Sequence, residues 1–371
     1  MDKKMRIGII FGGKSAEHEV SLQSAKNIIG AIDKMKYDVV VLSIDKKGSW
    51  HLHQNPDFLL CEDNLQELQI EPTNEEVALI PGEQSTQLIT TSNKKTMNEI
   101  DVVFPVLHGP YGEDGTVQGL LKLANIPFVG ASVLGSAIGM DKDVMKRLLR
   151  DAGLPIAQFL VFNKSSLSEI TFEEIETKLG LPFFIKPANL GSSVGIRKVK
   201  KREEFEKAVH NAFQYDTKIL LEECVLGREI ECSVLGNDNP IASLPGEIIP
   251  HDDFYSYKAK YIDEKGALLD IPAKLPDNIR EQVREYAIQA FKVLCCEGMA
   301  RVDFFLRENM DIIINEINTI PGFTKISMYP KLWEVSGIPY EELIDRLIQL
   351  GIERFKREQQ LKTSVLNDKE C

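Results

Sequence analysis

The stretch RVDFFLRENMDIIINEINTIPGFTKIS, residues 301–327, decides the fold. Residues 301–306 are rich in β-branched and aromatic side chains, residues 311–317 are rich in isoleucine, and the four residues between them are typical of a turn. Two such runs joined by a short turn predict a β-hairpin. The hairpin gives a frame on which the polar side chains of both strands can be placed.

The polar side chains of this hairpin are expected to converge on one face. Side chains alternate along a strand, so Arg301 and Asp303 share one face. Glu316 and Asn318 share a face for the same reason, and pairing the strands brings the two pairs close together. Carboxylate and amide oxygens suit Mg²⁺ that carries phosphates, and Arg301 can stabilise developing negative charge. Taken alone, the pattern also fits a strand pair with solvated charges.

Length and composition limit the class of protein. A chain of 371 residues exceeds the usual size of one domain, which predicts two or three domains. The formal net charge of -12 argues against a nucleic-acid-binding protein but leaves anionic small molecules open. The six cysteines form no CxxC or zinc-binding pattern, no apolar run is long enough to span a membrane, and no signal peptide is recognisable. We therefore expect a cytoplasmic protein without membrane association.

The N-terminal third follows the order of a parallel α/β sheet. Residues 5–11 predict an apolar strand and residues 17–35 a helix, with a Gly-Gly loop between them and a further apolar strand after them. Another strand, 100–107, ends at the glycine-rich segment 108–115. Ligands in such sheets bind at the carboxyl ends of the strands, where both glycine segments lie.

The remaining segments alternate between helical and strand patterns. Residues 137–151 predict one amphipathic helix. The polar and aromatic segment 251–266 predicts a long functional loop. Residues 45–100 are polar and irregular, so we expect loops and edge strands there.

The segment from Gly8 to Ser15 fits the pattern of a phosphate-binding P-loop, G-x-x-x-x-G-K-[ST]. In a true P-loop the strand precedes the first glycine, whereas Gly8 lies inside the predicted strand. Too little chain then remains to wrap phosphates. A P-loop nucleotide switch that uses Lys14 is therefore kept only as an alternative from another class of protein.

A second glycine loop, residues 191–195, follows the predicted strand that ends in Lys186. Its small residues would let backbone N–H groups approach phosphate oxygens, and Lys186 and Lys142 could add positive charge. A plain hairpin turn flanked by surface lysines would explain the same residues. Three carboxylates beyond this loop could contact a nucleotide: Glu222 and Glu223 at the base and Glu229 at the ribose.

Two residues of the N-terminal third are candidates for binding a small substrate. Glu19, near the start of the first predicted helix, could bind an ammonium group, since a helix N-terminus keeps such a carboxylate charged. Helix capping by Ser15 and Glu17 is the alternative use of this segment. His108 fits either a structural loop histidine or a member of the site.

Four segments occur in a characteristic order: GGKSAEHEVSL at 12–22, HGPYGEDGT at 108–116, KPANLGSSVG at 186–195 and NEINTIPGFT at 315–324. Together they resemble the D-alanine–D-alanine ligases, which are ATP-grasp enzymes of peptidoglycan precursor synthesis. The resemblance runs from about residue 5 to residue 355 and is poor over residues 50–98.

The resemblance implies an α/β protein with an ATP-grasp fold, three domains and ATP held between the last two. The expected division is a Rossmann-like N-terminal domain over 1–136, a central ATP-grasp subdomain over 137–218, a C-terminal ATP-grasp subdomain with the metal site over 219–355, and a frayed tail over 356–371. The family also implies a homodimer.

The resemblance further implies roles for individual residues. For ATP it implies Lys142, Lys186, Glu222, Val225 and Glu229, with Lys260 at the γ-phosphate. For two Mg²⁺ ions, which Mn²⁺ could replace, it implies Asp303, Glu316 and Asn318. For the first D-alanine it implies Glu19 at the ammonium group, together with Ser192, Tyr261 and His108. Arg301 and the backbone of Gly322 would stabilise the tetrahedral intermediate, and Ser327 and Met328 would bound the second D-alanine.

The implied chemistry has two steps. ATP phosphorylates the carboxylate of the first D-alanine, and the amine of the second D-alanine attacks the acyl phosphate to give D-alanyl-D-alanine. Water would destroy the acyl phosphate, so segment 251–266 is the expected lid. Ligases with D-serine or D-lactate at the second site are the alternatives; Tyr261 favours the dipeptide, and Met328 leaves D-serine open.

Overall fold

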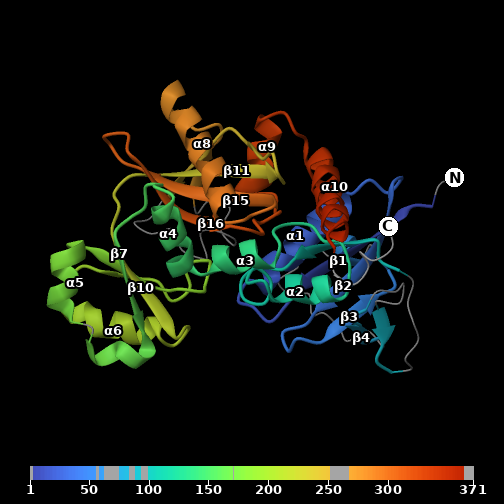
Figure 1. Cartoon of the computed structure of the whole chain (residues 1–371), viewed down its shortest axis with the longest axis horizontal. Coiled ribbons are helices and arrows are strands. Elements are labelled where there is room, and N and C mark those ends of the chain that lie inside the picture. The colour runs from blue at the N-terminus through green and yellow to red at the C-terminus, as the bar shows by residue number, and fades with distance from the viewer. Residues whose placement is uncertain are drawn as a thin grey trace, which may run out of the picture.

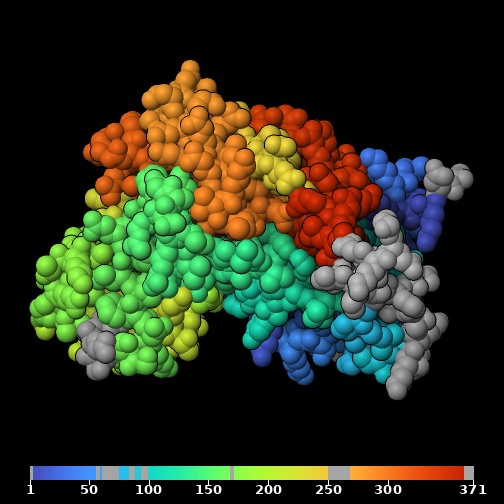
Figure 2. Space-filling model, viewed as in Figure 1, coloured from blue at the N-terminus to red at the C-terminus, as the bar shows by residue number. Residues whose placement is uncertain are grey.

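The computed structural model describes residues 3–55, 58–61, 75–82, 88–92, 99–169, 171–250 and 267–362. These residues form three main sheets covered by helices, and a small two-stranded ladder. Figure 1 shows the N-terminal sheet on the right, the second sheet at the lower left and the third sheet above them. Figure 2 shows that the surface is hollowed between the second sheet's lobe and the N-terminal sheet. The expected lid, 251–266, with Lys260 and Tyr261, lies outside the described residues.

The N-terminal part is a parallel sheet with one antiparallel edge. Its elements are β1 (Met5–Gly12), α1 (His18–Ala31), β2 (Tyr37–Ile44), β3 (Trp50–His53), the 3₁₀ turn η1 (Phe58–Cys61), β4 (Val77–Leu79), β5 (Leu88–Thr90), β6 (Val102–Val106) and α2 (Thr116–Leu123). The strand order is β3-β2-β1-β6, with β1 parallel to both neighbours. Helices cover both faces of this sheet, so its strands are apolar on both faces. Ile9 of β1 packs on the α1 side, and Ile10 packs on the α2 side.

The second sheet is antiparallel and has two helices on one face. The helices that lead into it and the elements of the sheet itself are, in chain order, α3 (Val133–Met140), α4 (Lys142–Asp151), β7 (Phe159–Asn163), the 3₁₀ turn η2 (Lys164–Glu169), α5 (Phe172–Leu179), β8 (Phe183–Pro187), β9 (Arg197–Val199), α6 (Arg202–Ala212) and β10 (Lys218–Glu223). The strand order is β7-β10-β8-β9. Phe205 makes edge-on contacts with Phe172 and Phe183, which joins both helices to the sheet. Because β10 pairs with β7 and β8, the expected domain boundary at residue 218 is wrong; this unit continues to Glu223.

The third sheet contains the hairpin predicted from the sequence. Its elements are β11 (Arg228–Gly236), β12 (Ile241–Ala242), β13 (Gly246–Pro250), β14 (Ala267–Asp270), α8 (Asp277–Val293), β15 (Gly298–Leu306) and β16 (Ile312–Asn318), followed by α9 (Met328–Val335) and α10 (Tyr340–Gln359). The strand order is β14-β13-β11-β15-β16, and β15 and β16 are antiparallel. The predicted hairpin is confirmed, and α8 covers the apolar face of β11 and β15.

The last helix returns to the N-terminal sheet. Leu343 and Leu347 of α10 share one buried core with Ile7 and Phe104 of β1 and β6. Figure 1 shows α10 beside β1, far from the second sheet. Arg354 of α10 donates a hydrogen bond to the carbonyl oxygen of Phe128 at 2.8 Å, and its guanidinium group lies 4.2 Å from the centre of that ring. The chain therefore completes its first core with its last helix.

Two further sequence expectations differ from the structure. The single helix expected over 137–151 is divided into α3 and α4, because Asp141 adopts an extended backbone and its carboxylate caps α4 by accepting from Asp143 and Val144. The expected start of the frayed tail, at residue 356, is too early. Helix α10 continues to Gln359, and Arg357 pairs with Asp238 at 2.8 Å. Within the described ranges, none of the helices is long and apolar enough to cross a membrane.

Candidate active site

The polar face of the β15–β16 hairpin brings together the four predicted side chains. Arg301 faces Asn318 across the ladder, and Asp303 faces Glu316. The Arg301 guanidinium group donates to both carboxylate oxygens of Asp303, at 2.7 and 2.8 Å, and Asn318 donates to Asp303 at 3.0 Å. Arg301 also pairs with Glu231 of β11 at 2.9 Å. The expected juxtaposition of two carboxylates, an amide and an arginine is confirmed.

One cavity of about 300 Å³ joins this hairpin to the second sheet. Lys142 at the start of α4 reaches Glu316, with 3.4 Å between the ammonium nitrogen and the nearer carboxylate oxygen, and donates to the carbonyl oxygen of Leu190 at 2.9 Å. The cavity is lined by these expected nucleotide-binding and site residues: Lys142, Lys186, Ser192, Glu222, Val225, Glu229 and Glu316. The structure therefore brings together every expected nucleotide-binding residue that it describes.

Glu222 is the anionic centre of a buried group of lysines. The residue is 3% exposed, and its carboxylate forms ion pairs with Lys146 and Lys186. Burial by itself raises the pKa of Glu222, but the charges and hydrogen bonds of the two lysines outweigh it and hold that pKa below its ordinary value. Lys146 was missed in the sequence; the available signal was its position one turn after Lys142 on α4. The cavity wall therefore contains a buried carboxylate whose negative charge is balanced by two neighbouring lysines.

The first glycine segment contributes Glu17, and this corrects the assignment of Glu19. Ser192 of the second glycine loop donates a hydrogen bond to the carboxylate of Glu17, although the two residues are 175 positions apart. Glu17 is 6% exposed, whereas the Glu19 side chain is 39% exposed and pairs with Lys46 at 2.6 Å. Because α1 begins at His18, Glu17 precedes the helix and faces the loop, while Glu19 belongs to the first turn. The expected grouping of Glu19 with Ser192 is wrong.

His108 and Glu113 tie the 108–115 segment to the end of β16. The buried His108 ring donates a hydrogen bond from Nδ1 to the carbonyl oxygen of Ile320 at 3.0 Å, and its Nε2 lies 3.2 Å from the Ser24 hydroxyl. Glu113 accepts from the backbone N–H of Gly109 at 2.7 Å and of Ile320 at 3.2 Å. Burial lowers the pKa of His108 to about 4, so the ring is neutral near pH 7. Burial, reinforced by the charge of Glu17, raises the pKa of Glu113 to about 8.

The segment after β16 contains the three residues expected near the acyl group and the second substrate. Gly322 lies so close to Ser327 that a Cβ atom there would be 2.6 Å from the serine Oγ, so a side chain at this position would require Ser327 to shift. Ser327 precedes α9 and accepts from the backbone N–H of Thr324 at 3.0 Å. Met328 is buried in a small core with Ile248. The roles expected for Gly322, Ser327 and Met328 toward substrate stay predictions.

The P-loop alternative is not favoured by the geometry. Gly8 lies inside β1, as the sequence indicated. The Gly12 amide donates to the Ser21 hydroxyl at 2.7 Å, and the Gly13 amide donates to the carbonyl oxygen of Ile44 at 2.7 Å. Both amides are therefore engaged within the N-terminal domain and do not form a phosphate cradle.

In the part of the chain that the structure describes, no group of three or more His, Cys, Asp or Glu residues is arranged to hold a metal ion.

Comparisons with known proteins agree over nearly the whole chain. Family models described as D-ala D-ala ligase N-terminus and D-ala D-ala ligase C-terminus match residues 6–131 and 148–349. The chain is 58% identical to a D-alanine–D-alanine ligase from Oceanobacillus iheyensis, covering 97% of this chain and 99% of that one.

Two solved structures are also similar. The D-alanine–D-alanine ligase from Coxiella burnetii has a TM-score of 0.85 and 41% identity, covering 96% of each chain. The VanG D-Ala:D-Ser ligase from Enterococcus faecalis has a TM-score of 0.84 and 35% identity, covering 94% of this chain and all of that one. With both family models matched in order and a relative well above half identical over its whole length, the chain belongs to the D-alanine–D-alanine ligase family.

Proposed function

We propose that this chain joins two D-alanine molecules into D-alanyl-D-alanine at the expense of ATP, for the synthesis of peptidoglycan precursors. The observation that carries the proposal is the hydrogen bond from Ser192 to Glu17. It links the cavity that contains Lys142 and Lys186 to the carboxyl end of the N-terminal sheet. A nucleotide in that cavity and a small amino acid at Glu17 would therefore be neighbours.

The first step requires ATP and the first substrate to meet at this link. Lys142 and Lys186 supply positive charge for the phosphates, and the 191–195 loop closes over them. Glu17, in place of Glu19, binds the ammonium group of the first D-alanine. The carboxylate of this D-alanine then lies toward the nucleotide, where transfer of the γ-phosphoryl group from ATP gives D-alanyl phosphate. Phosphorylation converts a poor acyl donor into a good one.

The polar hairpin face suits a divalent cation. Asp303, Glu316 and Asn318 offer carboxylate and amide oxygens on one side of the ladder, the hard ligands that Mg²⁺ prefers. We propose that these three residues hold two Mg²⁺ ions or Mn²⁺. Bound there, the cations would neutralise phosphate charge.

In the second step the amine of the second D-alanine attacks the acyl carbon of D-alanyl phosphate, which forms the peptide bond and expels inorganic phosphate. Arg301 and the backbone N–H of Gly322 stabilise the developing negative charge on the acyl oxygen, and Ser327 and Met328 bound the second substrate. D-Serine is not favoured in this position, since the relative named as a D-Ala:D-Ser ligase is less similar than the relative named as a D-alanine–D-alanine ligase. D-Lactate is not favoured because the relatives that match nearly the whole chain are named as D-alanine–D-alanine ligases. We further propose a homodimer in the cytoplasm.

The test is ADP release from the purified protein with Mg²⁺-ATP, with and without D-alanine, with separation of the amino-acid products. We expect ADP release that depends on D-alanine and yields D-alanyl-D-alanine. ATP hydrolysis that is indifferent to D-alanine and yields no dipeptide would overturn the proposal. Parallel reactions with D-serine or D-lactate added to D-alanine test the second site.

A further inference from the structure

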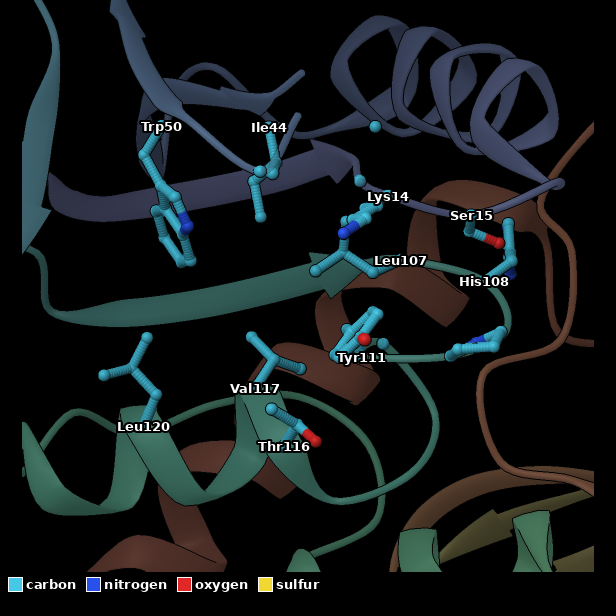
Figure 3. A pocket seen from close by; sticks show the side chains of 15 residues that line it. Lys14, Ser15, Ile44, Trp50, Leu107, His108, Tyr111, Thr116, Val117 and Leu120 are labelled. Carbon is cyan, nitrogen blue, oxygen red and sulfur yellow. The ribbon is translucent and has the colours of Figure 1, made fainter. Parts of the chain in front are cut away.

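A second cavity lies in the N-terminal domain, at the carboxyl ends of β1, β2 and β6. Its volume is about 380 Å³, within the range of sites that bind small molecules. Ile44, Trp50 and Leu107 wall it on the sheet side, and Val117 and Leu120 of α2 wall it on the other (Figure 3). The carboxyl end of a parallel sheet is the usual place for a ligand in this kind of fold. The active-site residues proposed above leave this apolar chamber unused.

Lys14 gives the apolar cavity a single positive charge. It lines the cavity beside Ser15, and Figure 3 shows both side chains at the same edge. Lys14 makes no ion pair or hydrogen bond with any other residue that the structure describes. The neighbouring amides of Gly12 and Gly13 are already bonded to Ser21 and Ile44, so they do not add a phosphate cradle. One available cation above an apolar chamber is complementary to a monoanion with an apolar body.

The same cavity touches the segments that hold the first-substrate site. Ser15 accepts a hydrogen bond from the backbone N–H of Glu17 at 3.1 Å. His108, also on the cavity wall, is fixed to Ile320 on the far side. A molecule that packs against Ser15 and His108 therefore restrains both segments beside the carboxylate of Glu17.

We propose that this cavity is a regulatory site for a small carboxylic acid with an aromatic or branched apolar body, whose carboxylate pairs with Lys14. Its effect on the enzyme rests on the proposed function. By fixing Ser15 and His108 before substrate arrives, the ligand reduces the ordering required when D-alanine binds. It therefore lowers the KM for D-alanine.

Binding is tested without turnover, so that its outcome is independent of ligase activity. The probe is 3-phenylpropionate, and 3-phenyl-1-propanol is its uncharged counterpart. Trp50 on the cavity wall reports binding by fluorescence, since the other tryptophan, Trp333, is buried in the core. We expect saturable binding of both probes, with the carboxylate about threefold to tenfold tighter because of its charge-assisted contact. Absence of saturable binding by either probe overturns the proposal.

Matched variants locate the bound probe. Lys14→Gln should reduce the affinity of 3-phenylpropionate to that of the alcohol. Leu120→Phe should fill the cavity and remove binding of both compounds, whereas Leu123→Phe, at a site 69% exposed on the same helix, should preserve it. Equal loss in both leucine variants, or simple competition of the probe with D-alanine or ATP, would place the probe elsewhere and overturn the proposal.

Regulation is tested by measuring ADP release against D-alanine concentration with and without 3-phenylpropionate. We expect a KM about fivefold lower with the probe bound, which is the lower range of typical coupling between sites. In Lys14→Gln the same shift should require a roughly threefold to tenfold higher concentration of the probe, in line with its weaker binding. Binding with an unchanged or raised KM overturns the regulatory role. Absence of ligation in both conditions, with binding intact, rejects the proposed function instead.

Discussion

The two glycine loops of this molecule look alike in sequence and are used differently. Each follows a strand and has a lysine nearby. In the first, the amides of Gly12 and Gly13 bond within their own domain, and Lys14 stands above an apolar cavity. In the second, Ser192 crosses to Glu17, and the surrounding lysines pair with carboxylates. Whether a glycine loop can bind phosphate therefore depends on whether its amides are already engaged within the fold, and a sequence pattern alone does not decide it.

The largest test of the comparison removes a carboxylate beside the second loop. Glu316→Ala should reduce ADP release in the presence of D-alanine by at least about a hundredfold, because it removes a proposed metal ligand and the partner of Lys142. Steady-state kinetics with varied Mg²⁺ measure the effect. Glu308→Ala, in the turn of the same hairpin, is the control and should retain normal turnover. A Glu316→Ala enzyme near the wild-type rate would disprove the metal assignment.

The second test compares two carboxylates beside the first loop. Glu17→Gln should raise the KM for D-alanine about tenfold to a hundredfold, since a hydrogen bond to a charged group contributes about 1.5–3 kcal/mol. Glu19→Gln, two residues away, should change it less than about twofold, because its partner is the exposed Lys46. Reversal of these two results would restore the sequence-based assignment of Glu19.

The third test replaces the lysine near each loop, Lys186 or Lys14, by alanine. Lys186→Ala should weaken ATP binding by about tenfold, because Lys186 lines the nucleotide cavity. Lys14→Ala should leave ATP affinity within about twofold, because an exposed charge outside the site contributes little. Calorimetric titration with ATP and Mg²⁺ measures both. Loss of ATP binding only in Lys14→Ala would revive the P-loop switch.

The smallest test concerns the packing of the 108–115 segment against the chain after β16. Burial lowers the pKa of His108 to about 4, so the folded state binds fewer protons than the unfolded state between that value and the ordinary one near 6.5. The stability from this site is complete above pH 6.5 and is lost as the pH falls toward 4, by at most about 1.4 kcal/mol per pH unit. Urea unfolding at several pH values should show a shallower loss in His108→Asn. The exposed His210→Asn should follow the wild type.

The hairpin and the order of motifs could be predicted from sequence because their signals are local. Alternation along a strand places Arg301 with Asp303, and the turn between the strands limits the register to within one residue. The structure confirms that pairing. The expected ATP residues also converge, although their positions came from family resemblance.

Other parts depend on contacts that the sequence does not reveal. Glu17 and Glu19 are distinguished only by the residue at which α1 begins, and helix ends are the least certain feature of a sequence-based prediction. Lys146 looks like a surface lysine until β10 places Glu222 beside it. Glu113 gains its role from Ile320, which lies 207 residues away. The break at Asp141 arises because a capping bond outcompetes helix continuation.

The packing of α10 into the first core has a consequence for how the chain is made. Ile7 and Phe104 are synthesised early, yet the surface that covers them includes Leu343 and Leu347. Domains that emerge from the ribosome generally fold one after another. Here the first sheet stays incomplete until α10 has been translated, and its apolar face needs protection for that time. A nascent chain released before α10 would therefore be a natural substrate for chaperones and proteases.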